Sequence, residues 1–322
     1  MPKTRLFALP LFVALGACSI HRATPERASA AEPVNASAMA DDHSGHDMSA
    51  GTARAMAGAT GGPLVIDMRQ GTTIAPGNAE AAARLLASPR HAEWAMIPAA
   101  AGSKDSIAAW VVYPERKTNA PVVVVIHEIF GLSTWVRSVA DQLAADGFIA
   151  IAPDLLSIER GGATTDSLAY DVARAMIGKV TPDKMNAMVA AVANYGMALP
   201  AAAKRYGVVG YCWGGSASFN QAVFDAPGLR AAVVYYGTSP SVEDMQRIKV
   251  PVLGLYGGND QRVNATIPRA DSTMKAIGGT YVSHVYDGAG HGFLRAQDQP
   301  ANAEAAKQAW PATVAWFKKY LD

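Results

Sequence analysis

One cysteine in a glycine-rich turn carries the strongest chemical signal in this sequence of 322 residues. Cys212 lies in Gly-Tyr-Cys-Trp-Gly-Gly (210–215), between a short apolar run at 206–209 and a helix-like run at 216–224. A sharp strand-to-helix turn strains its central residue, so small neighbours are needed. The helix N-terminus behind the turn favours a thiolate. The pattern predicts a nucleophile, and the simpler alternative is a buried structural cysteine.

Residues with acid–base chemistry follow other apolar runs. Glu128, Asp260 and His291 each come shortly after such a run, as Cys212 does. In an open α/β sheet the reactive residues gather at the carboxyl ends of the strands. The order nucleophile, acid, histidine is that of the α/β-hydrolases, whose usual turn is G-x-S-x-G. We expect His291 to take the thiol proton and Asp260 to orient the imidazole. The alternatives are a histidine that caps a turn and an Asx-turn aspartate.

Attack on a carbonyl also requires two donors for the developing oxyanion. In this architecture one donor is the backbone N–H of the residue after the nucleophile, which is Trp213. The other comes from the loop after the valine-rich run at 121–126, and Ile129 is the expected donor. Because both groups belong to the backbone, the side chains at these positions are free to vary.

The elements that must position these residues alternate between strand and helix. The run 121–126 is continuous and β-branched, as expected of a strand buried on both faces of a parallel sheet. The sequence therefore predicts an α/β-hydrolase fold, an open and mostly parallel sheet with helices on both faces. Expected strands cover 93–98, 107–113, 121–126, 147–152, 206–209, 230–236, 250–256 and 281–286, and expected helices cover 78–87 (capped by Asn78), 133–145, 168–177, 185–199, 216–224, 267–277 and 301–321.

Composition narrows the class of protein. Hydrophobic residues make up 50% of the chain and charged residues 17%, which is typical of a globular protein with a packed core. The formal net charge of +1 indicates neither a nucleic acid nor an anionic membrane surface as partner.

The N-terminus has the features of a bacterial export signal. Lys3 and Arg5 precede the apolar run 6–15, which is too short for a membrane-spanning helix, and Leu-Gly-Ala-Cys (15–18) follows. The sequence predicts a lipoprotein-type signal peptide at 1–18 with lipidation of Cys18. It therefore predicts an exported protein, in the periplasm or anchored to a membrane by lipid. The alternative is an ordinary cleaved signal without the lipid.

Residues 19–62 are rich in small and polar residues and predict a disordered linker, followed by a hydrolase domain at 63–322. Within the linker, His43 and His46 lie among aspartates and a methionine, a patch that could hold copper or zinc loosely. A solvated tail is the simpler interpretation, so no metal site is predicted.

Together the motifs resemble the dienelactone hydrolase family (carboxymethylenebutenolidase-like α/β-hydrolases) over about residues 90–322. The matching pieces are His-Glu-Ile-Phe-Gly (127–131), Gly-Tyr-Cys-Trp-Gly-Gly (210–215), Tyr-Tyr-Gly (235–237), Gly-Gly-Asn-Asp (257–260) and Gly-His-Gly-Phe-Leu-Arg (290–295).

The resemblance implies a catalytic triad of Cys212, His291 and Asp260. It implies that Glu128 contacts the thiol and helps to switch it between resting and activated states, and that Arg295 binds a substrate carboxylate. Substrates of the family include cyclic enol-lactones, and neither cofactor nor metal is implied.

The chain departs from the family pattern at two places. Members that cleave dienelactones use a second arginine before the nucleophile, and here Arg160 and Arg174 are candidates outside any aligned motif. Gly292 stands where a hydroxyl-bearing side chain is found in such members.

The leading hypothesis is an exported hydrolase of esters or lactones, some carrying a carboxylate, that works through a Cys212 thioester. One alternative is a non-catalytic binding or metal-handling lipoprotein on a hydrolase scaffold. Another is a redox-sensing thiol, which would lack a resolving cysteine once Cys18 is lipidated.

Overall fold

The structure is a computed structural model that describes residues 74–100 and 102–322. The predicted signal peptide, the lipidation site Cys18, the linker with His43 and His46, and the domain boundary at 62/63 lie outside the described residues.

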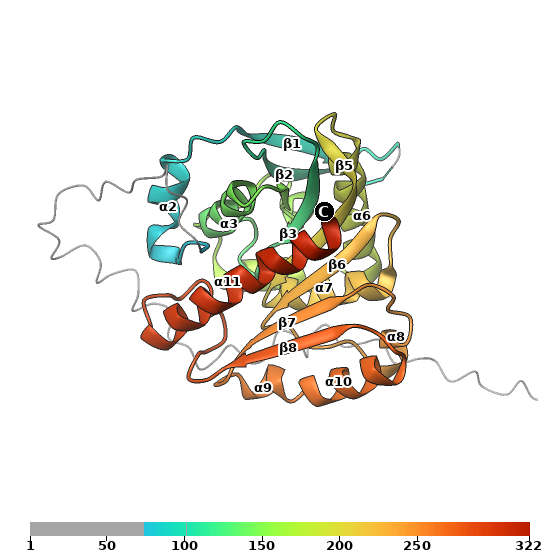
Figure 1. Ribbon diagram of the computed structural model, residues 1–322. Coiled ribbons are helices and arrows are strands. Elements are labelled where there is room, and N and C mark those ends of the chain that lie inside the picture. Colours follow the sequence, from blue (N-terminus) through green and yellow to red (C-terminus); the bar gives the residue numbers. More distant parts are fainter. Residues whose placement is uncertain (1–73, 101) are drawn as a thin grey trace, which may run out of the picture. The chain divides into compact units, whose positions relative to one another are not determined.

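An eight-stranded sheet forms the centre of the described chain, with strand order β1-β2-β4-β3-β5-β6-β7-β8 (Figure 1). The pairs β1–β2 and β2–β4 are antiparallel, and every other neighbouring pair is parallel. The open, mostly parallel sheet of the α/β-hydrolase fold is therefore confirmed. The strands are β1 (Ala92–Pro98), β2 (Ser106–Val112), β3 (Ala120–Ile126), β4 (Ile149–Pro153), β5 (Ala202–Tyr211), β6 (Leu229–Tyr235), β7 (Val252–Gly257) and β8 (Tyr281–Tyr286).

Helices cover both faces of the sheet. On one face α3 and α11 pack against the strands, and α2 packs on α3; on the other face lie α6, α7 and α10 (Figure 1). Each face buries its own hydrophobic cluster. The helices are α2 (Asn78–Leu86), α3 (Thr134–Ala145), α4 (Ser157–Arg160), α5 (Tyr170–Ile177), α6 (Pro182–Ala198), α7 (Trp213–Phe224), α8 (Val242–Met245), α9 (Gln261–Asn264), α10 (Ile267–Ala276) and α11 (Pro300–Leu321).

The β-branched run in β3 is buried at all seven positions, as its sequence predicts. It pairs with β4 on one side and with β5, which leads to the nucleophile, on the other. Because a central parallel strand is covered by helices on both faces, alternate side chains enter opposite hydrophobic clusters. This packing fixes the strand end that carries the sequence His-Glu-Ile (127–129).

Several predicted element boundaries were wrong; strand β5, for example, begins at Ala202 instead of residue 206. Gly77, rather than Asn78, is the N-cap of α2, since Gly77 has an extended backbone and Asn78 is the first helical residue. The Asn78 backbone N–H donates to the Arg295 carbonyl at 2.8 Å. The helix after the nucleophile begins at Trp213 instead of residue 216. Helix α6 begins at Pro182, three residues earlier than predicted, where the Thr181 hydroxyl accepts the Lys184 N–H. A threonine cap followed by proline is a favourable start that the periodicity alone did not reveal.

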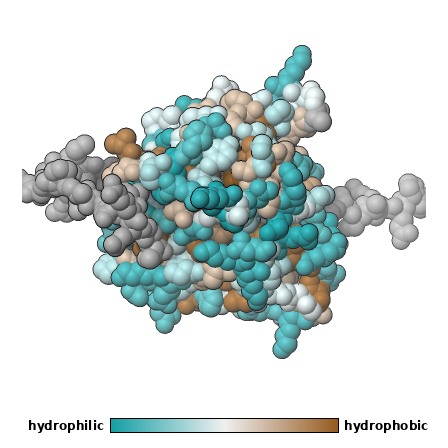
Figure 2. All heavy atoms as spheres, turned by 45° about the horizontal axis from the view of Figure 1, so that its top comes forward, coloured by the Kyte–Doolittle hydropathy of each residue, from teal (hydrophilic) through white to brown (hydrophobic). Residues whose placement is uncertain are grey.

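No helix among the described residues is long and apolar enough to cross a membrane. The face drawn in Figure 2 is mostly hydrophilic, with apolar residues scattered in small groups. Small scattered groups are normal for a protein surface.

Candidate active site

Cys212 occupies the turn between β5 and α7 with backbone angles φ 56° and ψ −116°. A positive φ is uncommon for a residue with a side chain and costs free energy that the surrounding structure must offset. Two backbone hydrogen bonds hold the turn: the Cys212 N–H donates to Tyr235 O, and the Ser216 N–H donates to Cys212 O, both at 3.1 Å. The strained elbow predicted from the sequence is present, and the thiol is nearly buried at 8% exposure.

The glycines around the elbow are required by close backbone approaches. A Cβ at Gly210 would lie 1.8 Å from the Gly214 carbonyl oxygen, and one at Gly214 would lie 2.4 Å from the His127 carbonyl oxygen. A Cβ at Gly237 would lie 2.2 Å from the Ser216 nitrogen. These distances explain why the turn needs small residues, and why a glycine follows the two tyrosines at the end of β6.

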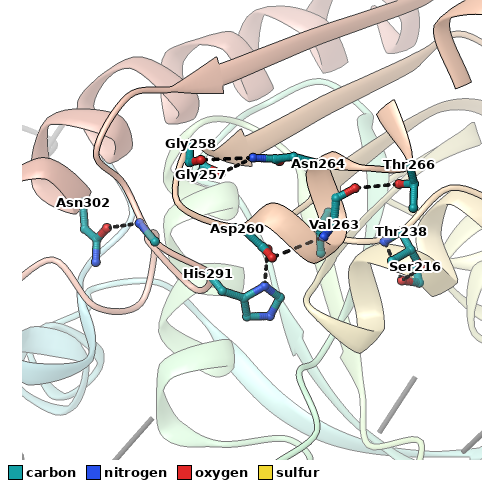
Figure 3. Close-up of polar contacts among 11 residues, drawn as sticks. Ser216, Thr238, Gly257, Gly258, Asp260, Val263, Asn264, Thr266, His291 and Asn302 are labelled. Atoms are coloured by element: carbon teal, nitrogen blue, oxygen red, sulfur yellow. Dashed lines mark hydrogen bonds and ion pairs between the residues drawn. The ribbon is translucent and has the colours of Figure 1, made fainter. Parts of the chain in front are cut away.

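His291 and Asp260 meet beyond the ends of β8 and β7 (Figure 3). The His291 Nδ1 lies 2.5 Å from Asp260 Oδ2, and both side chains are largely buried. The other carboxylate oxygen of Asp260 accepts the Val263 N–H at 3.3 Å, so Asp260 also caps the short helix α9. The Asp260 carboxylate is thus anchored by its own helix and can orient the imidazole.

The imidazole of His291 is coupled to the thiol of Cys212. Burial alone would lower the pKa of His291, but the charge of Cys212 and hydrogen bonds to Cys212 and Asp260 outweigh burial and raise it to about 10. Burial raises the pKa of Asp260, yet the hydrogen bond and charge of His291 leave it below its usual value. The pairing therefore favours the imidazolium form of His291 and the carboxylate form of Asp260 at neutral pH.

We expect the His291 imidazole to remain protonated at pH 8 and to lose its proton as the pH rises through about 10. Because this pKa lies above the unfolded value of about 6.5, the pairing stabilises the fold fully below pH ~6.5. That stabilisation is lost as the pH rises towards 10. In Cys212→Ala the pKa of His291 should fall, since two of its raising contacts disappear. NMR titration of the imidazole nitrogens checks this, with the exposed His284 as reference, and an unchanged midpoint in Cys212→Ala would contradict it.

The two expected oxyanion donors come from the ends of two neighbouring strands, β3 and β5. Ile129 follows β3, and Trp213 is the first residue of α7. Neither N–H group donates to a backbone carbonyl in the turns, loops and caps of residues 74–100 and 102–322. Both residues are nearly buried, so an oxyanion held by their N–H groups would be largely shielded from water.

His127, which was not predicted as a site residue, links the loops after β3 and β4 by two hydrogen bonds. Its Nε2 accepts the Leu155 N–H at 3.1 Å, so its Nδ1 carries the proton and donates to the Glu128 carbonyl at 2.5 Å. Burial lowers the pKa of His127, which keeps the ring neutral. The Glu128 carbonyl belongs to the same peptide unit as the Ile129 N–H. Because this peptide is planar and trans, the hydrogen bond from His127 to the Glu128 carbonyl also fixes the direction of the Ile129 N–H.

Glu128 and Arg295, predicted separately, form an ion pair. Arg295 Nε lies 3.0 Å from Glu128 Oε2, and the guanidinium lies over the Phe130 ring at 5.3 Å from its centroid. Glu128 is 5% exposed, so the pair provides a buried carboxylate with its counter-charge. Two residues 167 positions apart meet because the loops after β3 and β8 share one edge of the sheet.

A hollow opens beside Cys212, with about 250 Å³ of empty space including the solvent at its mouth. Its walls are Cys212, Trp213, Ser216, Tyr236, Thr238 and Arg262. The candidate second arginines, Arg160 on α4 and Arg174 on α5, do not line this hollow. Arg262 does, and its place two residues after Asp260 was the signal that could have identified it. Gly292 has φ +74°, which favours glycine, and open space where a side chain would begin.

Among the described residues, no group of three or more His, Cys, Asp or Glu side chains is placed to hold a metal ion. The patch with His43 and His46 lies outside them.

Comparison with known proteins agrees with this geometry. The model of the dienelactone hydrolase family matches residues 107–321, which span the sheet from β2 to the last helix. The chain belongs to the dienelactone hydrolase family. The resemblance, the fold and membership of a class of carboxylic ester hydrolases are thereby confirmed.

This dienelactone hydrolase family member is similar to several individual proteins. A Methylorubrum extorquens protein named "Putative carboxymethylenebutenolidase" is 33% identical over 227 residues, covering 66% of this chain and 77% of that protein. A Salmonella typhimurium protein of the same name is 30% identical over 260 residues, covering 77% of this chain and 95% of that protein. A solved Klebsiella pneumoniae structure, "Putative Dienelactone Hydrolase", is 29% identical with a TM-score of 0.63 over 72% of this chain and 99% of that chain.

Proposed function

We propose that this dienelactone hydrolase family member hydrolyses esters or lactones through a covalent thioester on Cys212. The observation that carries the proposal is the contact of the His291 imidazole with the Asp260 carboxylate at 2.5 Å, beside a Cys212 thiol near enough to raise the pKa of that imidazole. A nucleophile, a base and a group that orients the base are the parts that acyl transfer needs.

In the first half of the reaction the thiolate sulfur attacks the carbonyl carbon, and the carbonyl π pair moves to oxygen. The backbone N–H groups of Ile129 and Trp213 donate to this oxyanion. As the carbonyl re-forms, the carbon–oxygen bond to the leaving group breaks, and the His291 imidazolium gives that oxygen its proton. In a lactone the leaving oxygen remains attached to the acyl chain.

In the second half, water attacks the thioester carbon while the neutral His291 takes its proton. Collapse of the second oxyanion expels the Cys212 thiolate, which again pairs with the imidazolium. The balance is ester plus water giving acid plus alcohol, so no oxidant, metal or cofactor enters the steps.

Glu128 and Arg295 belong to the part of the proposal that comes from the family. The Arg295 guanidinium is already paired with the Glu128 carboxylate. A substrate carboxylate that binds Arg295 would therefore either share the guanidinium with Glu128 or displace the Glu128 carboxylate from it. Glu128 released in this way becomes available to act on the thiol, which is the switching role that the resemblance implies.

The test is a pre-steady-state assay with p-nitrophenyl acetate. We expect a burst of about one p-nitrophenolate per chain when deacylation is slower than acylation, and an acetyl group on Cys212 after acid quench and mass spectrometry. Acetyl found on another residue, with none on Cys212, would overturn the thioester proposal.

The export signal supports a further proposal, that the protein is a bacterial lipoprotein attached through Cys18 to a membrane. The support is the basic start, the short apolar run and Leu-Gly-Ala-Cys at 15–18. Labelling of cells with radioactive palmitate tests it. The wild-type chain should carry the label and Cys18→Ala should not, whereas label in both would contradict lipidation at this site.

A further inference from the structure

His127 follows β3 and is fully buried. Its Nε2 accepts the Leu155 N–H at 3.1 Å, and its Nδ1 donates to the Glu128 carbonyl at 2.5 Å. A ring that accepts at one nitrogen and donates at the other is a neutral imidazole with its proton on Nδ1. Burial, which lowers the pKa of His127, favours the same neutral form. Both ring nitrogens are therefore bonded to the backbone, so His127 has no nitrogen left to act on a substrate.

The same residue contacts the first turn of α7, where the second expected oxyanion donor lies. The His127 ring stacks on the Trp213 indole, with ring centroids 5.5 Å apart and an angle of 26° between the planes. The main chains are also close, because a Cβ added at Gly214 would lie 2.4 Å from the His127 carbonyl oxygen. His127 thus contacts both segments that are expected to bind the oxyanion, one through a hydrogen bond and the other through packing.

The loop after β4 orients the ring. Leu155, whose N–H His127 accepts, follows Asp154, which is fully buried. The Asp154 carboxylate accepts the Leu156 N–H at 3.1 Å and also accepts the Thr164 N–H. These bonds order the loop that presents the Leu155 N–H, and this N–H in turn sets the orientation of the imidazole.

We infer that His127 is a positioning residue for the oxyanion hole, which directs the Ile129 N–H at the oxyanion by holding the Glu128 carbonyl. The Glu128 carbonyl and the Ile129 N–H belong to one planar trans peptide, so a donor that fixes the carbonyl oxygen also fixes the N–H, which points the opposite way. Donors held in place beforehand need no reorganisation as the charge develops, which is the source of their effect on rate. The inference rests on the proposed function, because it requires that an oxyanion forms.

The competing explanation is that His127 is only a well-packed core residue. Loss of packing would disturb the elbow as a whole and would slow every reaction of Cys212. Loss of positioning would slow only the reactions that form an oxyanion. The two explanations therefore differ in the ratio between an acyl transfer and a reaction of the same sulfur that forms no oxyanion.

The experiment measures two reactions of Cys212 in the full chain. Acylation by p-nitrophenyl acetate forms a sulfur–carbon bond at the carbonyl carbon, passes through an oxyanion and releases p-nitrophenolate, and the burst gives its rate. Alkylation by iodoacetamide forms a sulfur–carbon bond at the methylene carbon as iodide leaves, without an oxyanion, and mass spectrometry of the Cys212 peptide gives its rate. The ratio of the two rates reports oxyanion stabilisation separately from the reactivity of the thiol.

Two polar variants separate the roles of the two ring nitrogens. In His127→Asn the amide nitrogen is bonded to Cγ, as Nδ1 is, and can still donate to the Glu128 carbonyl. In His127→Gln the amide lies one atom further along the side chain, where its oxygen can accept the Leu155 N–H, but no donor is bonded to Cγ. We expect His127→Gln to lower the acylation-to-alkylation ratio by roughly 10- to 100-fold, as for a misdirected oxyanion donor. His127→Asn should keep the ratio close to the wild-type value.

Equal ratios in His127→Gln and the wild type would overturn the inference. Equal falls of the ratio in both variants would also overturn it, because donation to the Glu128 carbonyl would then not be the deciding contact. NMR of the wild-type chain is a second test that needs no folded variant. The ring nitrogen shifts of His127 should show a neutral imidazole protonated at Nδ1, and a proton on Nε2 would overturn the inference. Failure of wild-type Cys212 to be acylated, with normal alkylation, would overturn the proposed function itself and not this inference alone.

Discussion

Replacing Cys212 by alanine is expected to lower kcat for p-nitrophenyl acetate by roughly 10⁴-fold or more, because the enzyme then lacks the sulfur proposed to attack the substrate. The oxyanion donors that we propose at Ile129 and Trp213 remain, so a small residual rate above that in buffer is expected. His291 and Asp260 also remain, but without the thiol they can do no more than activate water. Steady-state release of p-nitrophenolate measures the loss.

The chain supplies its own matched control, since its two cysteines are Cys18 and Cys212. In protein purified without the lipid, Cys18→Ala makes the same substitution and should retain the wild-type kcat, because Cys18 lies in the predicted export signal, outside the predicted hydrolase domain. Circular dichroism should give the same spectrum for both variants and the wild type. Full turnover in Cys212→Ala would refute the thioester proposal, and equal losses in the two variants would point to an indirect effect.

Gly210→Ala is expected to destabilise the fold by more than about 3 kcal/mol, beyond the usual effect of an oversized core residue. The added Cβ would lie 1.8 Å from the Gly214 carbonyl oxygen and 2.3 Å from its carbon. Both are backbone atoms in the first turn of α7, so no side-chain rotation relieves the clash. The elbow would have to open, which displaces Cys212 as well.

Gly162→Ala is the control for this prediction. No atom lies within 4 Å of a Cβ at that position, and Gly162 does not have a positive φ. Its free energy of unfolding should stay within about 0.5 kcal/mol of the wild type. Denaturant unfolding followed by circular dichroism measures both variants. Equal midpoints for Gly210→Ala and Gly162→Ala would show that the elbow tolerates a methyl group and that the packing argument is wrong.

The contacts of the site explain why its partners come from distant loops. Three strands, β3, β5 and β7, are parallel, and their carboxyl ends lead to Glu128, Cys212 and Asp260. The last strand, β8, leads to His291. An exposed active site on a single loop could not provide the same burial, and burial is what makes each charge depend strongly on its neighbours. The coupling between Cys212 and His291 follows from this arrangement.

The element order was predictable because each strand and helix leaves a local pattern. The continuous β-branched run of β3 and the strand–turn–helix pattern around Cys212 reflect burial and backbone geometry within a few residues. Helix starts were less predictable. Helix α2 has no side-chain cap, and the N–H of its first residue, Asn78, donates to the distant carbonyl of Arg295.

The sequence by itself determined which side chains could serve as nucleophile, base and orienting acid, because residue type and position at strand ends are local properties. Only the tertiary structure decided which charges meet. In the structure Glu128 pairs with Arg295, and His127 donates a hydrogen bond to the Glu128 carbonyl. The arginine that lines the hollow is Arg262, instead of Arg160 or Arg174. The physical reason is that loop packing across the sheet edge sets these distances, and no periodic pattern in the chain records it.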